Sequence, residues 1–387
     1  MLDTDGFVAG TYTVENVDRP AFLVELRNME TGEMHWMEMR DMHDQQVRHA
    51  SSHEQRVSAE TGDTDAADSS GEKKPRLKIS ADDVRNRQAR FEQKRTTYVE
   101  ENATLSKAEF DALFLGSIRQ SNVVGNCGPL ATFLSLAAGG ENFEAIMRTS
   151  IRTTDYGWAV TIPLGKPGGR EIKISHANIK TGLHVSLSRK KGQRGLSELD
   201  PVSGPQGYQL LEAVLAKLVL GRVDDLQYPV SRRSIEKMRT HVILKKLFGD
   251  DVLYTGKKYK GQDTFENPIP GSVCLSSLLA FKPGGKVMTV SIDSGKDSQG
   301  NMLPGTFFNY TDLQGSTYNM AAKHFYAITK VNVDSNARPP TVQSVEVVNP
   351  HDSSQTMVFP LSDFLNLFDS MQTASIDLNN LFTGGNA

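Results

Sequence analysis

Apolar residues recur at helical spacing through the middle of the chain. Residues 106–109 read Ser-Lys-Ala-Glu, a capping-box pattern, and the apolar positions from there to Ile118 share one helix face. Residues 128–138 are apolar nearly all round, which predicts a buried helix. We expect further helices over 208–220 and 233–248.

The pattern changes from helical to strand-like in the second half of the chain. Alternating or continuous runs of β-branched and aromatic residues predict four strands, over 287–292, 324–331, 342–348 and 357–359. A short helix is expected over 361–370. Turn-rich loops between the strands favour an antiparallel sheet. Helices followed by strands predict an α+β fold with two lobes.

The first hundred residues differ in composition from the rest. Residues 1–40 alternate in places and predict a small β-rich segment. Between 48 and 76 the one large aliphatic residue is Val57, and there is no aromatic residue, so this stretch buries too little apolar surface to fold. We therefore expect a disordered or charged linker over 41–103 and a globular domain over 104–387.

Charge and cysteine content narrow the function classes. The 387 residues include 43 Lys and Arg against 46 Asp and Glu, a net charge of −3, which argues against a nucleic-acid partner. Two cysteines exclude a disulfide scaffold and a four-cysteine zinc site, but they leave room for a catalytic thiol. No apolar run is long enough to predict a membrane span.

The N-terminal residues bear on localisation. Acidic residues stand where a signal peptide needs a basic segment followed by an apolar one. We therefore expect a cytoplasmic protein, or one exported by a route without a cleavable signal peptide.

The most informative stretch runs from Gln120 to the helix expected at 128–138. A Gly-Asn turn delivers Cys127 to the start of that helix, whose N-terminal partial charge favours a thiolate and lowers the thiol pKa. The Gln120 side-chain amide and the backbone N–H of Cys127 are candidate donors to an oxyanion. On this stretch alone, a buried structural cysteine remains an equal alternative. The second cysteine, Cys274, adjoins an apolar run and is interpreted as a small core residue.

A histidine and an asparagine in the second half complete a candidate triad. His324 opens a strong strand, and Asn349 ends the next strand along the chain. Two adjacent antiparallel strands would bring these side chains together. A Cys–His pair with an Asn that orients the imidazole is the thiol form of a catalytic triad. The order Cys127, His324, Asn349 favours catalysis over unrelated polar roles.

Residues 105–372 resemble the protease core of calpain-like cysteine peptidases. Five motifs occur in the order found in that family, and together they carry the resemblance. They are Gln120…Gly-Asn-Cys127…Leu-Ala, Gly207-Tyr-Gln-Leu-Leu-Glu-Ala-Val-Leu-Ala-Lys217-Leu, His324-Phe-Tyr-Ala-Ile-Thr-Lys-Val, Val348-Asn-Pro and Leu361-Ser-Asp-Phe-Leu-Asn-Leu-Phe.

The resemblance implies a papain-like fold and an endopeptidase activity. It makes Cys127 the nucleophile, His324 the acid–base group, Asn349 its orienting partner and Gln120 an oxyanion donor. The implied substrate is a protein or peptide, and no cofactor is required. Calcium dependence stays open, because the acidic residues that bind calcium in animal calpain cores have no match in this sequence.

Three positions depart from the family pattern. Gln120 lies one residue further from Cys127 than in the family, and Gly128 and His351 stand where the family has tryptophan. Two alternatives to an endopeptidase remain. One is a thiol-based deamidase or acyltransferase that acts on protein side chains. The other is a catalytically decayed binding module, with the N-terminal region as a further candidate for partner binding.

Overall fold

The computed structural model describes most of the chain and divides it into two compact units. One unit is Met1–Gln93 with Ser335–Pro340, and the other is Lys94–Asp334 with Thr341–Ala387. The described residues are 10–18, 23–29, 34–38, 76–79, 81–120, 125–181, 202–224, 226, 232–236, 238–249, 252–253, 275, 277–292, 307–334, 337, 341–368 and 370–382.

The first unit contains a four-stranded antiparallel sheet with the order β3-β2-β1-β4. Its strands are β1 (Gly10–Asp18), β2 (Leu23–Asn28), β3 (Met34–Glu38) and β4 (Arg76–Ile79). Helix α2 (Ala81–Asn102) follows. Strand β4 and helix α2 give regular structure to parts of the range 41–103, whereas residues 48–75 lie outside the described residues. The domain boundaries at 40 and 103 stay predictions.

The second unit is mixed α+β with antiparallel sheets, as the sequence predicts. The α-helices whose bounds the described residues define are α3 (Lys107–Phe114), α4 (Cys127–Ala137), α5 (Glu141–Ser150), α6 (His176–Thr181), α8 (Gln206–Leu220), α9 (Thr240–Phe248), α11 (Leu361–Leu367) and α12 (Leu378–Phe382). A short 3₁₀ helix, η1 (Arg232–Ile235), precedes α9.

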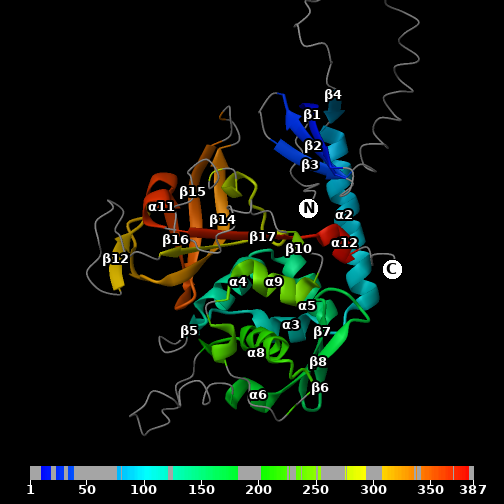
Figure 1. Cartoon of the computed structure of the whole chain (residues 1–387), viewed down its shortest axis with the longest axis vertical. Helices are drawn as coiled ribbons and strands as arrows, with labels where there is room; N and C mark the ends of the chain where they lie inside the picture. The colour runs from blue at the N-terminus through cyan, green and yellow to red at the C-terminus, as the bar shows by residue number, and fades with distance from the viewer. Residues whose placement is uncertain are drawn as a thin grey trace, which may run out of the picture. The chain divides into compact units, whose positions relative to one another are not determined.

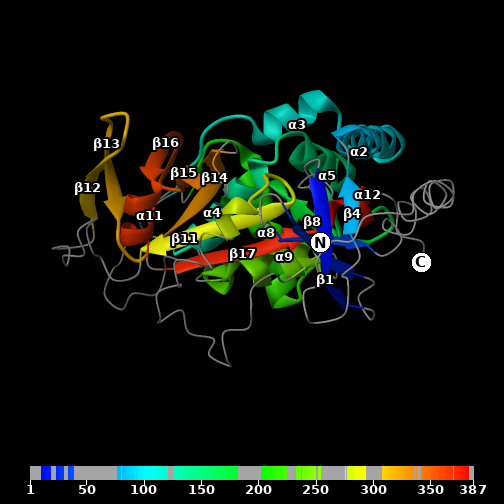
Figure 2. The same ribbon diagram turned by 90° about the horizontal axis from the view of Figure 1, so that it is seen from above.

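The main sheet of this unit has six strands in the order β10-β17-β11-β14-β15-β16, several of which are labelled in Figures 1 and 2. Its strands are β10 (Val252–Leu253), β11 (Lys286–Ile292), β14 (His324–Asp334), β15 (Thr341–Asn349), β16 (Asp352–Pro360) and β17 (Ser370–Ile376). All four predicted strands are confirmed. Each neighbouring pair is antiparallel.

Three smaller antiparallel sheets complete the unit. They are β6 (Ile151–Thr154), β7 (Gly157–Ile162) and β8 (Arg170–Ser175), then β12 (Phe307–Thr311) with β13 (Thr317–Ala321), and β5 (Arg119–Gln120) with β9 (Val202–Ser203).

The helix predicted over 233–248 is wrong in its middle, where the chain leaves the helical conformation. Arg239 is extended, at φ −82° and ψ 146°, and separates η1 from α9. The sheet explains the break, because the backbone N–H of Thr240 donates to Oε1 of Gln372 at 2.8 Å. The Thr240 hydroxyl also bonds that of Thr289 at 2.6 Å. Tertiary hydrogen bonds thus override the local helical pattern.

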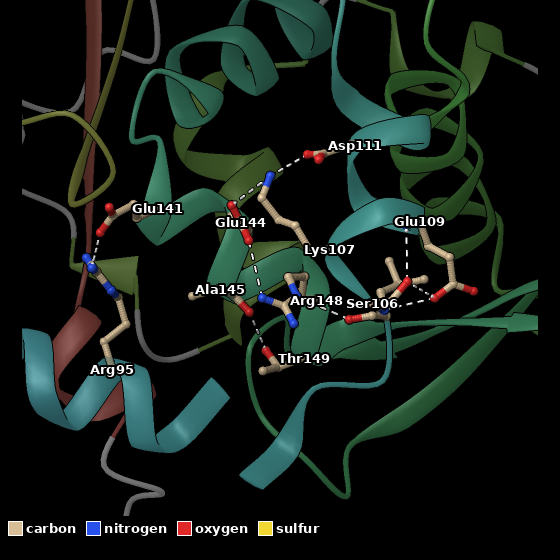
Figure 3. Close-up of polar contacts among 11 residues, drawn as sticks. Arg95, Ser106, Lys107, Glu109, Asp111, Glu141, Glu144, Ala145, Arg148 and Thr149 are labelled. Atoms are coloured by element: carbon tan, nitrogen blue, oxygen red, sulfur yellow. Dashed lines mark hydrogen bonds and ion pairs between the residues drawn. The ribbon is translucent and has the colours of Figure 1, made fainter. Parts of the chain in front are cut away.

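The capping box predicted at 106–109 is confirmed at the start of α3 (Figure 3). The backbone N–H of Ser106 donates to Oε2 of Glu109 at 2.8 Å, and the Glu109 N–H donates to Oγ of Ser106 at 3.2 Å. An ion pair joins the neighbouring elements, because Lys107 reaches Glu144 of α5 at 3.4 Å; within α5, Glu144 also pairs with Arg148 at 3.2 Å. These contacts fix α3 against α5, beside the segment that leads to Gln120.

Helix α4 is buried on nearly every face and packs against β11 and β14. Ser135, two turns into the helix, joins it to both strands. Its hydroxyl donates to the carbonyl of Ile328 at 2.8 Å and accepts from the backbone N–H of Met288 at 3.0 Å. The side chain therefore fixes the depth and rotation of the helix that begins at Cys127.

We predict that Ser135→Ala destabilises the second unit. The change removes the partner of two buried backbone groups, at a cost of about 1–3 kcal/mol for each group left unsatisfied. Urea unfolding followed by circular dichroism measures the difference. Thr149→Val is the matched control, because that buried hydroxyl bonds only carbonyls of its own helix turn, Ala145 and Ile146. Equal stability of the two variants would contradict the anchoring role of Ser135.

Candidate active site

Cys127 is the first residue of α4, as the sequence predicts, and its side chain is half-buried. The backbone N–H groups of Phe325 and Gly128 act on its sulfur to lower the pKa of the thiol. Phe325 directly follows His324 in β14, so the thiol lies against the strand that carries the candidate base. The structure therefore brings the candidate nucleophile to the start of β14.

Burial raises the pKa of the Cys127 thiol, against the expectation that the helix N-terminus lowers it. The N–H bonds from Phe325 and Gly128 oppose the rise, and the carboxylate of Glu236 adds to it. Desolvation has the larger effect on the pKa, because the apolar helix packed against the sheet excludes water from the thiolate. The resting sulfur is a protonated thiol.

His324 and Asn349 meet as predicted, at the ends of two neighbouring strands. Nε2 of His324 lies 2.9 Å from Oδ1 of Asn349, and both side chains are buried. The chain enters β14 through Lys323, whose left-handed φ of 56° is costly for a residue other than glycine. The Tyr326 hydroxyl holds that turn, because it donates to the Ala321 carbonyl and accepts from the Ala321 N–H.

The hydrogen bonds around Asn349 assign the protonated nitrogen of His324. The backbone N–H of His351 donates to the same Asn349 atom at 2.9 Å, so that atom is the amide oxygen. An amide oxygen only accepts, and Nε2 of a neutral His324 therefore carries the hydrogen. The lone pair is left on Nδ1, which is the nitrogen able to take a proton.

The ring of His351 covers the His324 ring, in the position where the resembling family has tryptophan. The two ring centroids lie 4.1 Å apart. Burial, then the charge of His351, lowers the pKa of His324 to about 3, and the Asn349 bond opposes this. Burial also lowers the pKa of His351. Burial therefore favours a neutral imidazole beside a neutral thiol.

Gln120 lies in β5 and is tied to both halves of the site. Its backbone N–H donates to the carbonyl of Pro350 at 2.9 Å, next to Asn349. Its side-chain Nε2 donates to Oδ1 of Asn126 at 2.8 Å, next to Cys127. The structure thus gathers all four predicted site residues around one region, while their catalytic roles stay predictions.

Two acidic residues beside Cys127 were not predicted as site residues. Glu212 of α8 is fully buried and accepts from Nδ2 of Asn126 at 2.5 Å. Glu236 accepts from the backbone N–H of Gly125 at 3.4 Å. In the sequence, Glu212 stands in an amphipathic pattern that suits either a surface or an interlobe position, so nothing local marks its contact with residue 126.

Gly128 is required by its surroundings. A Cβ atom at this position would lie 2.7 Å from the backbone oxygen of Met238. Side chains essentially never approach a backbone oxygen so closely, so a tryptophan here needs a different path for the chain at 238. The departure from the family pattern at residue 128 therefore has a steric cause.

Other features of the described residues add no competing site. Within these residues, no group of three His, Cys, Asp or Glu side chains lies close enough to hold a metal ion. No helix in the part of the chain that the structure describes is long and apolar enough to cross a membrane. A groove between α2 and α5 is lined partly by the paired charges Arg95, Glu141, Glu144 and Arg148. The prediction for Cys274 lies outside the described residues.

Comparison with protein-family models, with curated proteins and with solved structures gives no match to this chain.

The lowered pKa of His324 predicts an acid-sensitive fold. An unfolded histidine has a pKa near 6.5, against about 3 in the folded protein, so between these values the unfolded state binds more protons. The stability that the neutral ring contributes is complete above pH 6.5 and is lost as the pH falls toward 3. One such proton changes the free energy of unfolding by at most about 1.4 kcal/mol per pH unit.

Urea unfolding at a series of pH values measures this slope for the wild type and for His324→Gln. We expect a shallower loss of stability below pH 6.5 in the variant. His176→Gln is the control, because that histidine is exposed to solvent, and it should keep the wild-type slope. A His324→Gln slope equal to the wild type would show that His324 does not titrate as its burial requires.

Proposed function

We propose that the second unit is a thiol hydrolase, a cysteine endopeptidase with a papain-like catalytic core that cleaves protein or peptide substrates. The observation that carries this proposal is the His324–Asn349 hydrogen bond of 2.9 Å, on a strand against which the helix that begins at Cys127 packs. The resemblance of residues 105–372 to calpain-like peptidases points to the same three residues.

The first step follows from the neutral resting state. Nδ1 of His324 takes the thiol proton of Cys127 as the sulfur attacks the substrate carbonyl carbon, and the carbonyl π electrons move to its oxygen. Because both groups rest uncharged, proton transfer accompanies attack rather than preceding it. Asn349 holds the ring in the tautomer that leaves Nδ1 available and stabilises the imidazolium that forms.

The remaining steps use the same groups in reverse. The backbone N–H of Cys127 and the Gln120 amide are the proposed donors to the oxyanion. When the tetrahedral intermediate collapses, His324 gives its proton to the leaving amine and a thioester remains on Cys127. Water then attacks the thioester with His324 as base, and the acid product and the free thiol are released.

Two other functions are compatible with these residues. A deamidase or acyltransferase acting on protein side chains passes through the same thioester, and a decayed binding module keeps the groups without turnover. The complete set of Cys127, His324 and Asn349 with matched hydrogen bonds favours turnover. Peptide hydrolysis is preferred because the five family motifs occur in one order.

We predict that Cys127→Ala abolishes turnover while the fold is retained. The full chain is incubated with a mixture of unrelated peptides, and mass spectrometry detects new termini, deamidated side chains or acyl adducts. We expect new termini, and a loss of several orders of magnitude in the variant, because triad members act as a unit. Cys274→Ala, which removes the other thiol of the chain, should stay close to wild type. Wild-type turnover by Cys127→Ala would refute the proposal.

We predict that substitutions at His324 and Asn349 reduce kcat/KM by different amounts. His324 transfers the proton, whereas Asn349 only orients the imidazole. The rate of His324→Ala should therefore fall to background, while Asn349→Ala keeps a measurable rate. Values of kcat/KM on one peptide identified in the mixture give the ranking. The opposite ranking would assign the proton transfer to another group.

A further inference from the structure

A buried chain of polar side chains connects three elements just behind the nucleophile. Gln120 of β5 donates to Asn126, and Asn126 donates to Glu212 of α8, at 2.8 and 2.5 Å. Asn126 and Glu212 have no exposed surface, and Gln120 is 7% exposed. Such a chain has few ways to rearrange, since bulk water does not reach its members.

The chemistry of the carboxylate fixes the direction of the whole chain. Nδ2 of Asn126 donates to Oε1 of Glu212, so Asn126 turns its NH₂ group toward α8. The Asn126 carbonyl oxygen then faces Gln120, which must present its own NH₂ group. This orientation of both amides is the one that an acceptor oxygen at residue 212 requires.

This orientation has a consequence for the start of α4. Asn126 is the N-cap residue of the helix, and asparagine at an N-cap normally accepts from the N–H groups of the first turn. Here its side chain makes no such bond. The first-turn N–H of Gly128 acts instead on the Cys127 thiol, whose pKa it lowers.

We infer that Glu212 is a positioning residue for Cys127. It holds the Asn126 side chain away from the helix N-terminus, so that the amide groups there serve the sulfur and the developing oxyanion. It also turns the Gln120 NH₂ group toward Asn126. The importance of Glu212 to catalysis rests on the proposed function. The effect of Glu212 on the Cys127 thiol is measurable without turnover.

The test is the rate at which iodoacetamide alkylates Cys127 in the folded full chain, followed by the mass of the labelled peptide. In Glu212→Gln the new amide can donate as well as accept, so the Asn126 amide is free to turn over and cap the helix. We expect alkylation at neutral pH to fall by roughly tenfold, the effect of about one hydrogen bond to a charged group. The thermal midpoint should change little, because glutamine has the same shape.

Asn126→Ser provides the second variant, since serine caps the helix and is too short to keep the chain. It should lose alkylation rate by a similar factor, and Glu212→Gln combined with it should cause no further loss, because both act through one side chain. Lys217→Met is the matched control on α8. That buried ammonium bonds the Lys173 carbonyl at 2.7 Å, so its loss should lower the thermal midpoint and leave alkylation unchanged.

Two results would overturn the inference. One is a Glu212→Gln variant that alkylates at the wild-type rate, which would make Glu212 purely structural. The other is additive loss in the double variant, which would show that Glu212 acts independently of Asn126. Failure of the peptidase proposal is a separate result. It would be seen as an absence of peptide cleavage, and the alkylation rates would not change.

Discussion

The packing of α4 against the six-stranded sheet is the constraint on which the candidate site depends. Ser135 bonds β11 on one side and β14 on the other, and through it the helix that begins at Cys127 is locked to the strand that begins at His324. The β14–β15 pairing then places Asn349 at His324. A shift of α4 along the sheet would separate the thiol from β14 without breaking either element.

The packing of α4 against the sheet also determines the pKa shifts of the site. A helix buried on all sides removes water from its first residue, so burial raises the pKa of the Cys127 thiol and lowers that of the His324 imidazole. Both changes favour the neutral forms, which explains why donors at the helix start matter. In the proposed reaction, Gly128, Phe325 and the amides held by Glu212 would stabilise a transient charge that the solvent no longer stabilises.

The sequence predicts the parts of this arrangement that depend on local chemistry. The capping box at Ser106, the apolar helix after Cys127 and the strands that carry His324 and Asn349 each follow from a pattern of a few residues. The meeting of His324 with Asn349 follows from strand order. Strand β17 is missed because its residues look polar, although Gln372 and Ser370 are buried and paired with α9 and β11.

What the sequence does not predict depends on contacts between distant residues. The break at Arg239 comes from Gln372, more than a hundred positions away, and the Glu212–Asn126 bond joins residues 86 positions apart. The pKa of Cys127 reverses expectation for the same reason, since a helix N-terminus is visible in sequence and depth of burial is not. The contact between the His351 and His324 rings likewise needs the turn after Asn349 to be known.

The central claim is that Cys127 forms a thioester with His324 as its base, and direct capture of that intermediate tests it. The full chain is mixed with a peptide that it cleaves, quenched in acid within the first turnover and analysed by intact and peptide mass spectrometry. The account predicts an added mass equal to the N-terminal fragment of the peptide, located on Cys127 and absent in His324→Ala. Peptide cleavage with no adduct on Cys127, or with an adduct on another residue, would contradict it.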